Sequence, residues 1–229
     1  MIAIFIVAFF VVVFWACYEQ AGSSMNLFAA NNTDLQLGSF HIPAAWFQNV
    51  NPAVIVIFAP LFAWIWVKLN KMGREPSTAV KMVIGLALLG FGFVFMVIGG
   101  RRADNGILVS PLWLVAAYTF HTWGELCLSP VGLSYVTKVA PVRFASLLMG
   151  VWFLANGAAN KIAGTIAELT PTPGEAAAAP RGGFIGMLQH VAITNHGFYT
   201  IFLVMALSAS LLMIFFVPTL KRLTSTVST

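Results

Sequence analysis

Two carboxylates placed in long apolar segments are the residues of this chain that could do chemistry. Glu125 lies about midway along an apolar segment that begins near Leu112, and Glu19 follows the apolar run of residues 1–18. An ionisable group at the centre of a bilayer costs ~2.5–3.5 kcal/mol, so it normally faces a bundle interior or a water-filled cavity. A buried carboxyl group also takes up a proton more readily than an exposed one. We therefore expect both residues to act on an ion or a substrate, the alternative being a structural bond to a neighbouring helix.

The residues that follow Glu125 support a functional site. Ser129 and Leu133 come four and eight positions later, so they share the helical face of Glu125. Pro130 and Gly132 should loosen the helix just past the carboxylate, as in the discontinuous helices around transporter sites.

Neither a metal site nor an enzyme is expected. His121 precedes Glu125 by four residues, but two ligands are weak evidence for a metal, and the sequence has no His-Glu-x-x-His motif. It also has no glycine-rich phosphate loop and no nucleophile elbow. We expect no cofactor.

Two other polar features lie in apolar segments. Asn51-Pro52 interrupts an apolar segment early, which either supplies an amide for gripping a polar ligand or only kinks a helix. Trp152, Asn156 and Asn160 are spaced four apart and form a polar-aromatic stripe. The tryptophan either faces a cavity, where it could cover a cation, or packs inside a bundle.

Composition identifies an integral membrane protein. Hydrophobic residues make up 59% of the chain and charged residues 8%, and the mean hydropathy is +0.89. A soluble domain carries about 25% charged residues. The net charge of +5 is spread over several loops, so it does not indicate nucleic-acid binding. Cys17 and Cys127 fall in apolar segments and are expected to be small buried residues.

The predicted fold is an all-α membrane protein with six transmembrane helices. Several apolar stretches approach or exceed the length that a helical span needs, whereas barrel strands would alternate over about 10 residues. The predicted spans are residues 1–30, 46–67, 82–99, 112–135, 145–169 and 196–217.

Basic residues predict the orientation of these spans. One side holds Lys68, Lys71, Arg74, Lys81, Lys138, Arg143, Lys221 and Arg222, and the other holds Arg101, Arg102 and Arg181. The first side is expected to be cytoplasmic, with both chain ends on it. Trp46 and Trp113 would then lie at the outer interface, and Trp64 and Trp66 at the inner one.

Four stretches resemble the proton-dependent oligopeptide transporter family of the major facilitator superfamily. They are FWACYEQAGSSMNLF (14–28), IPAAWFQNVNP (42–52), HTWGELCLSPVGLSYVTKVAP (121–141) and LMGVWFLANGAANKIAG (148–164). They lie in four of the six predicted spans, in order. The resemblance is to the carboxyl-terminal half alone, which is the second six-helix bundle of a major facilitator fold.

The resemblance implies roles for residues already noted. Glu125, in the GELCLSPVG motif, would hold the terminal ammonium of a di- or tripeptide, and Asn51 would hydrogen-bond the peptide backbone. Glu19, in the YEQ stretch, would couple transport to protons together with Glu125. Trp15, Tyr18 and Trp152 would line the pocket for peptide side chains, with Ser129 and Leu133 beside the peptide.

The resemblance also implies a missing part. The family's amino-terminal half carries an E-x-x-E-R motif and a lysine on its fourth helix, and neither feature occurs here. The expected function is therefore proton-coupled symport of di- and tripeptides across the cytoplasmic membrane, with this chain as one half of the transporter. The alternatives are carriage of another solute such as nitrate, or a membrane remnant that serves as an interaction module.

Overall fold

The computed structural model describes residues 2–139, 145–171 and 182–225, and nearly all of them are helical. The helices are α1 (Ile2–Tyr18), η1 (Glu19–Ala21), α2 (Ser24–Asn32), η2 (Ala44–Asn49), α3 (Val50–Lys71), α4 (Thr78–Asp104), α5 (Pro111–Val139), α6 (Ala145–Ala167), α7 (Gly183–Val191) and α8 (Asn195–Ser225). The strands β1 (Gln36–Leu37) and β2 (Phe40–His41) form an antiparallel hairpin.

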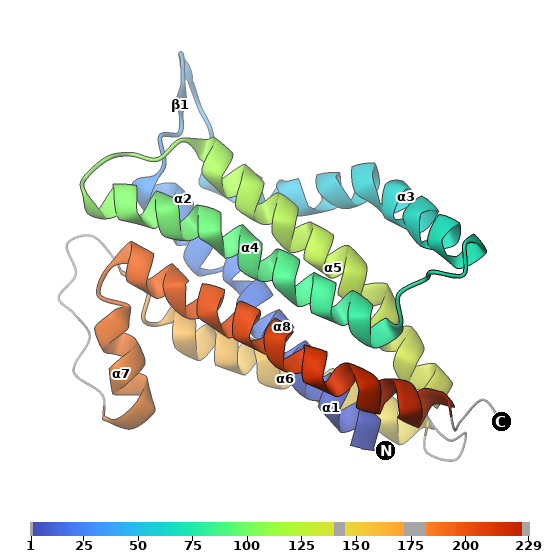
Figure 1. The fold of residues 1–229 in the computed structure, drawn as a ribbon. Coiled ribbons are helices and arrows are strands. Elements are labelled where there is room, and N and C mark those ends of the chain that lie inside the picture. Colours follow the sequence, from blue (N-terminus) through green and yellow to red (C-terminus); the bar gives the residue numbers. More distant parts are fainter. Residues whose placement is uncertain (1, 140–144, 172–181, 226–229) are drawn as a thin grey trace.

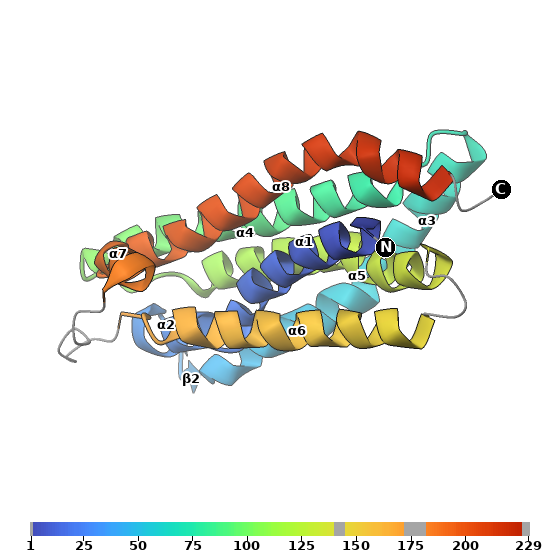
Figure 2. The ribbon, with the colours of Figure 1, turned by 90° about the horizontal axis from the view of Figure 1, so that it is seen from below.

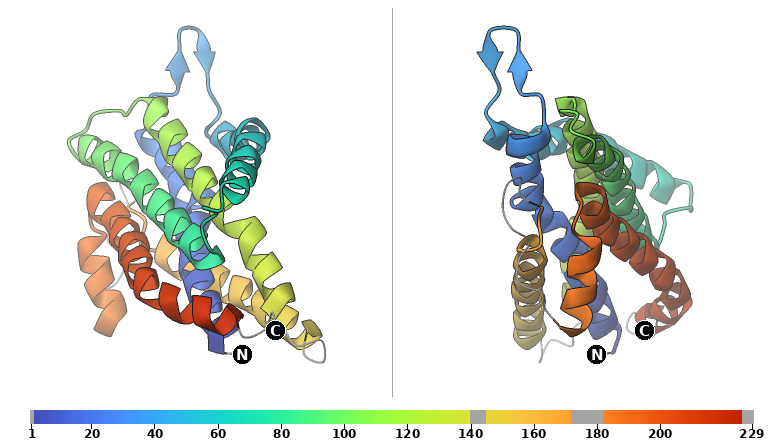
Figure 3. Two further views of the ribbon diagram at one scale, coloured as in Figure 1. Left: turned by 45° about the vertical axis from the view of Figure 1, so that its right-hand side comes forward. Right: turned by 90° about the vertical axis from the view of Figure 1, so that its left-hand side faces the viewer.

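Long helices lie side by side in a bundle (Figure 1). Seen from below, α4 and α8 lie on one side and α6 on the other, with α1 and α5 between them (Figure 2). The hairpin projects from one end of the bundle, and the start of α1 and the end of α8 lie at the opposite end (Figure 3). The interior is apolar and aromatic, with Phe10, Phe14, Phe93 and Phe202 almost fully buried.

Four helical segments among the described residues are long and apolar enough to cross a bilayer. These candidate spans are Ile4–Asn32, Ala44–Lys71, Thr78–Asp104 and Asn195–Arg222. The chain is therefore an all-helical, multi-pass membrane protein.

Glycines bring α4 and α5 into close contact. A Cβ atom added to Gly85 of α4 would lie 2.9 Å from the carbonyl oxygen of Gly124, and one added to Gly124 would lie 2.7 Å from that of Gly85. The two backbones therefore touch at this crossing, as small residues permit in membrane bundles. The crossing holds the part of α5 that carries Glu125, the residue after Gly124, next to α4.

The first apolar segment is not one continuous helix. We expected a helix over residues 1–30, but α1 ends at Tyr18, one 3₁₀ turn follows, and α2 begins at Ser24. The backbone of Ser23 leaves the helical region, and its hydroxyl donates to the carbonyl of Glu19 at 3.1 Å. Glu19 thus lies at a helix break rather than inside a helix.

Two proline effects expected from the sequence do not occur. Asn51-Pro52 does not interrupt a span, because α3 begins at Val50 and both residues lie in its first turn. The missing amide hydrogen of a proline has no helical partner to lose there. Helix α5 also continues through Pro130 and Gly132 to Val139.

Two short elements lie between the predicted spans and were not predicted. The hairpin lies in residues 31–44, where Gly38 has a φ of 62° at the turn. Helix α7 lies in residues 170–194, and it begins at Gly183 with a φ of 65°.

Candidate functional site

The helix break at Glu19 is held by hydrogen bonds from other helices. The hydroxyls of Tyr118 and Tyr199 donate to the carbonyls of Ala21 at 2.6 Å and Ser24 at 3.1 Å. The amide of Gln20 donates to the carbonyl of Ala163 on α6 at 3.2 Å. The bond to Ala21 satisfies a carbonyl that the break leaves without a helical partner in the absence of water, and the other two bonds tie the segment to α6 and α8.

The carboxylate of Glu125 lies where α1, α3 and α5 meet. Its Oε2 accepts the hydroxyl hydrogen of Tyr18 at 2.5 Å and an amide hydrogen of Asn51 at 2.9 Å. The same amide nitrogen of Asn51 lies 2.5 Å from the Tyr18 hydroxyl and 3.1 Å from the hydroxyl of Thr122. Three predicted site residues from three helices are thus brought together, with Thr122 as a fourth member.

Acceptor atoms on this cluster are left free. The Nδ2 atom of Asn51 must face the carboxylate, because its Oδ1 atom there would repel the carboxylate oxygen. Oδ1 of Asn51 and Oε1 of Glu125 accept no hydrogen bond from any described residue, and neither oxygen is sealed from solvent. Two acceptors and no free donor suit a cation with several N–H groups.

Glu19 lies close enough to Glu125 for their charges to interact. Its side chain is partly exposed on the 3₁₀ turn, while Tyr18, the residue before it, contacts Glu125 directly. The two carboxylates that the sequence singles out therefore belong to one electrostatic site.

Aromatic rings surround the Tyr18 side of this cluster. The ring of Trp15 meets that of Tyr18 edge-on at 5.1 Å between centroids, and Phe14 stacks on Tyr18 at 5.8 Å. His121 is fully buried against Phe93, at 4.5 Å between centroids, and neither of its ring nitrogens has a partner in the described part of the chain.

The remaining predicted site residues have other surroundings. Trp152 is 7% exposed and packs with the hydrophobic core, and Asn156 donates to its carbonyl at 3.2 Å. The structure describes no contact between Trp152 and the Glu125 cluster. Ser129 and Leu133 lie on α5 beyond the residues whose side chains are described.

Thr122 is a site residue that the sequence analysis missed. It lies one turn before Glu125 and is completely buried. Its hydroxyl donates to the carbonyl of Tyr118 at 2.7 Å while its oxygen accepts from Asn51. The only signal was its position on the Glu125 face of α5.

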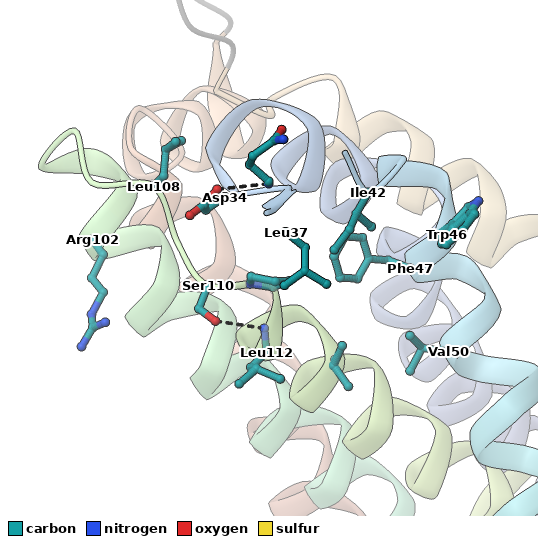
Figure 4. Close-up of a pocket in the computed structure, with 13 residues that line it drawn as sticks. Asp34, Leu37, Ile42, Trp46, Phe47, Val50, Arg102, Leu108, Ser110 and Leu112 are labelled. Atoms are coloured by element: carbon teal, nitrogen blue, oxygen red, sulfur yellow. Dashed lines mark hydrogen bonds between the residues drawn. The ribbon is translucent and has the colours of Figure 1, made fainter. Parts of the chain in front are cut away.

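A separate cavity of about 810 Å³ lies at the hairpin end of the bundle (Figure 4). Its lining contains none of the predicted site residues. The carboxylate of Asp34 accepts from the backbone of Gln36 at 3.2 Å, and the Ser110 hydroxyl accepts from that of Leu112 at 3.4 Å. These two side chains thus bond the backbone beside them, so we place the candidate site at Glu125 instead.

No group of three or more His, Cys, Asp or Glu side chains that could hold a metal occurs among the described residues.

Comparison with known proteins gives consistent matches. The sequence profile of the POT family matches residues 1–181. The uncharacterized transporter YclF of Bacillus subtilis (strain 168) is 48% identical over 158 residues, which are 69% of this chain and 32% of that protein. The peptide transporter YePEPT of Yersinia enterocolitica is 43% identical over 155 residues, 67% of this chain and 30% of that protein.

Solved structures match nearly the whole chain. The crystal structure of a peptide transporter POT in complex with sulfate superposes with a TM-score of 0.80 at 33% identity, covering 97% of this chain and 40% of that one. The chain spans about a third of the length of the curated relatives named above.

Proposed function

The chain belongs to the POT family, and on that premise we propose that it is one half of a proton-coupled symporter of di- and tripeptides. It would be the carboxyl-terminal six-helix bundle, with six spans formed by α1–α2, α3, α4, α5, α6 and α8. A transporter of this family is not an enzyme. The proposal of one half is supported by the resemblance in four stretches and by the fraction of each relative that the chain covers.

The observation that carries this proposal is the arrangement around Glu125. One oxygen of the carboxylate is held by Tyr18 and Asn51, while the other is free beside the free carbonyl oxygen of Asn51. The terminal ammonium of a peptide has three N–H donors and a positive charge. Bound to Oε1 of Glu125 and Oδ1 of Asn51, the ammonium would exchange its lost hydration for charge-assisted hydrogen bonds.

Proton coupling would follow from the closeness of the two carboxylates. Glu19 and Glu125 interact electrostatically, so the charge on one affects the charge on the other. An ammonium binds Glu125 only while that carboxylate is unprotonated, so the proton carried together with the peptide would be held by Glu19. We propose Glu19 and Glu125 as the proton-coupling pair, with protons as the only coupling ion and no cofactor.

The remaining wall of the site would come from an amino-terminal half. In transporters built from repeats, the substrate site lies between the two halves, which rock against each other. The groups that bind the peptide carboxylate would then belong to that amino-terminal half. On this chain, Trp15 and Tyr18 are placed to line the pocket, and we keep Trp152, Ser129 and Leu133 as proposed members.

The proposed location is the cytoplasmic membrane, with the chain ends inside. The larger number of basic residues on the side of the chain ends supports this orientation, and tryptophans with basic partners support the positions of the two interfaces. Lys68 lies over Trp64 at 4.7 Å at one end of the bundle, and Arg102 lies over Trp113 at 5.3 Å at the other. Such pairs suit the two interfaces of a bilayer, where an aromatic ring meets charged headgroups.

The test is dipeptide uptake by this chain joined to the amino-terminal half of a related peptide transporter, in cells that lack their own peptide uptake. We expect acid-driven uptake by the wild-type fusion, and at least a hundredfold loss with Glu125→Gln at equal amounts in the membrane. A matched control is Glu168→Gln, which removes an exposed carboxylate near the end of α6 and should leave uptake unchanged.

Three outcomes separate the alternatives. Uptake of a solute that is not inhibited by di- and tripeptides would indicate a carrier of another solute, such as nitrate. No uptake, with Glu19 and Glu125 replaceable without effect on the protein, would indicate an interaction module. Wild-type uptake by the Glu125→Gln variant would refute the role given to that carboxylate. The DNA upstream of the coding sequence of Met1 shows directly whether an amino-terminal half is encoded there.

A further inference from the structure

We infer that Tyr18 is a positioning residue that directs both the proton and the peptide ammonium to a single oxygen of Glu125, namely Oε1. This inference rests on the proposed function, in which Glu125 binds the ammonium. It gives Tyr18 a role other than the lining role expected from the sequence.

The hydrogens of the cluster can point in only one direction. The Thr122 hydroxyl donates to the carbonyl of Tyr118, so its oxygen can only accept from Asn51. The Asn51 amide is a donor to the Tyr18 oxygen, and an ionised Glu125 has no hydrogen of its own. The single hydrogen of the Tyr18 hydroxyl therefore points at Oε2, and donors linked in series strengthen one another.

This direction excludes a proton from Oε2. At 2.5 Å from the Tyr18 oxygen, a proton on Oε2 would face the hydroxyl hydrogen already there. The amide hydrogen of Asn51 approaches the same oxygen. A proton entering the site thus goes to Oε1, the atom that the ammonium also needs. Proton and ammonium then exclude each other at one atom.

Other titratable groups near Glu125 do not determine which of its two oxygens takes up the proton. Glu19 interacts with Glu125 through charge alone, and His121 of α5 has no hydrogen-bond partner among the described residues. On α3 the facing group is the amide of Asn51, which does not titrate. On α4 the buried Lys81 is paired with Glu75, and Lys161 of α6 is exposed. Tyr18 carries the hydroxyl group that donates to the carboxylate of Glu125.

Tyr18→Phe removes the donor and leaves the ring. A hydrogen bond to an ionised group favours that ionised form, so its loss makes Glu125 easier to protonate. The expected change is about tenfold in the proton concentration at which KM begins to rise at the acid end, or about one pH unit. In the wild type, the KM for dipeptides should rise tenfold per pH unit at the acid end, since proton and ammonium compete. In Tyr18→Phe this rise should begin about one pH unit higher.

The experiment is the pH profile of KM and of maximal rate for dipeptide uptake in the fused transporter described above. The matched control is Ser210→Ala on α8, which also deletes one buried hydroxyl but breaks a bond to the Val83 carbonyl of α4, away from the helix break. Its profile should coincide with that of the wild type. A Tyr18→Phe profile that coincides with both would overturn the inference while leaving peptide transport intact.

A second pair of variants tests the inference in case the Tyr18→Phe protein does not accumulate in the membrane. Thr122→Val removes the oxygen that orients Asn51, so the same shift is expected with a smaller size, and Thr122→Ser should restore the wild-type profile. An unshifted Thr122→Val profile would then overturn the inference. A wild-type fusion that takes up no dipeptide refutes the proposed function, and this inference falls with it.

Discussion

Substitution of Gly85 by alanine tests whether α4 and α5 touch backbone to backbone. The added Cβ would lie 2.9 Å from the carbonyl oxygen of Gly124 and 3.3 Å from the Cβ of Leu128. The first of these neighbours is backbone, so the clash is relieved only if the helices move apart. Overpacking of this kind costs ~1–3 kcal/mol. Alanine recovers about 1 kcal/mol of helix propensity relative to glycine.

The balance is a net loss of ~1–2 kcal/mol, because the rigid backbone contact places the overpacking cost in the upper part of its range. For a chain of this size, 1 kcal/mol shifts Tm by about 2–4 °C, so we expect Gly85→Ala to lower Tm by about 2–8 °C. The assay is thermal unfolding of the purified chain in detergent, at one protein concentration and one detergent concentration.

The matched control is Gly157→Ala on α6. A Cβ at this exposed helical position meets nothing within 4 Å, so only the gain in propensity applies and Tm should be unchanged or higher. A Gly85→Ala protein as stable as Gly157→Ala would refute the close crossing. It would also remove the argument that this crossing holds the part of α5 that carries Glu125 next to α4.

Two further predictions concern the ends of the helices. Asp104→Asn should lower stability by ~1–2 kcal/mol, seen as a lower Tm, because the carboxylate accepts the backbone N–H groups of Asn195 at 2.8 Å and His196 at 3.0 Å at the start of α8. An unchanged Tm would show that this cap contributes nothing. Lys81→Met breaks the 2.6 Å ion pair with Glu75 and should cost less than about 1 kcal/mol, since Glu75 is partly exposed. Limited proteolysis should nonetheless cut the α3–α4 connection faster, and equal cutting rates would contradict this.

Hydropathy points to the four described helical segments that are long and apolar enough to cross a bilayer. It misses the β-hairpin, whose strands have only two residues each, too few for an alternating pattern. It misses α7 for a similar reason, since nine residues are half the length of a span. Short elements of this kind depend on a turn glycine and on neighbouring segments, which a hydropathy pattern does not contain.

The sequence predicts which charged and polar residues belong to the candidate site, but it predicts few of the hydrogen bonds between them. Glu125, Tyr18 and Asn51 stand out because polar groups are rare in apolar segments, and the structure joins them. Asn51 was misplaced as part of an interruption, since the sequence does not show that α3 begins one residue earlier. Thr122 gave no signal beyond its position on the Glu125 face of α5, because a threonine in a membrane helix usually bonds the carbonyl four residues back, as this one does.

The break at Glu19 connects the candidate site to the rest of the bundle. An unbroken helix would satisfy its own backbone, whereas this break depends on Tyr118 of α5, on Tyr199 of α8 and, through Gln20, on α6. Glu19 and Tyr18 lie at the start of this turn, and Tyr18 donates to Glu125. A displacement of any of those helices relative to α1 must therefore strain or break a hydrogen bond next to the two carboxylates. The same bonds that permit a helix break in a membrane thus make the carboxylates sensitive to the movement of the surrounding helices.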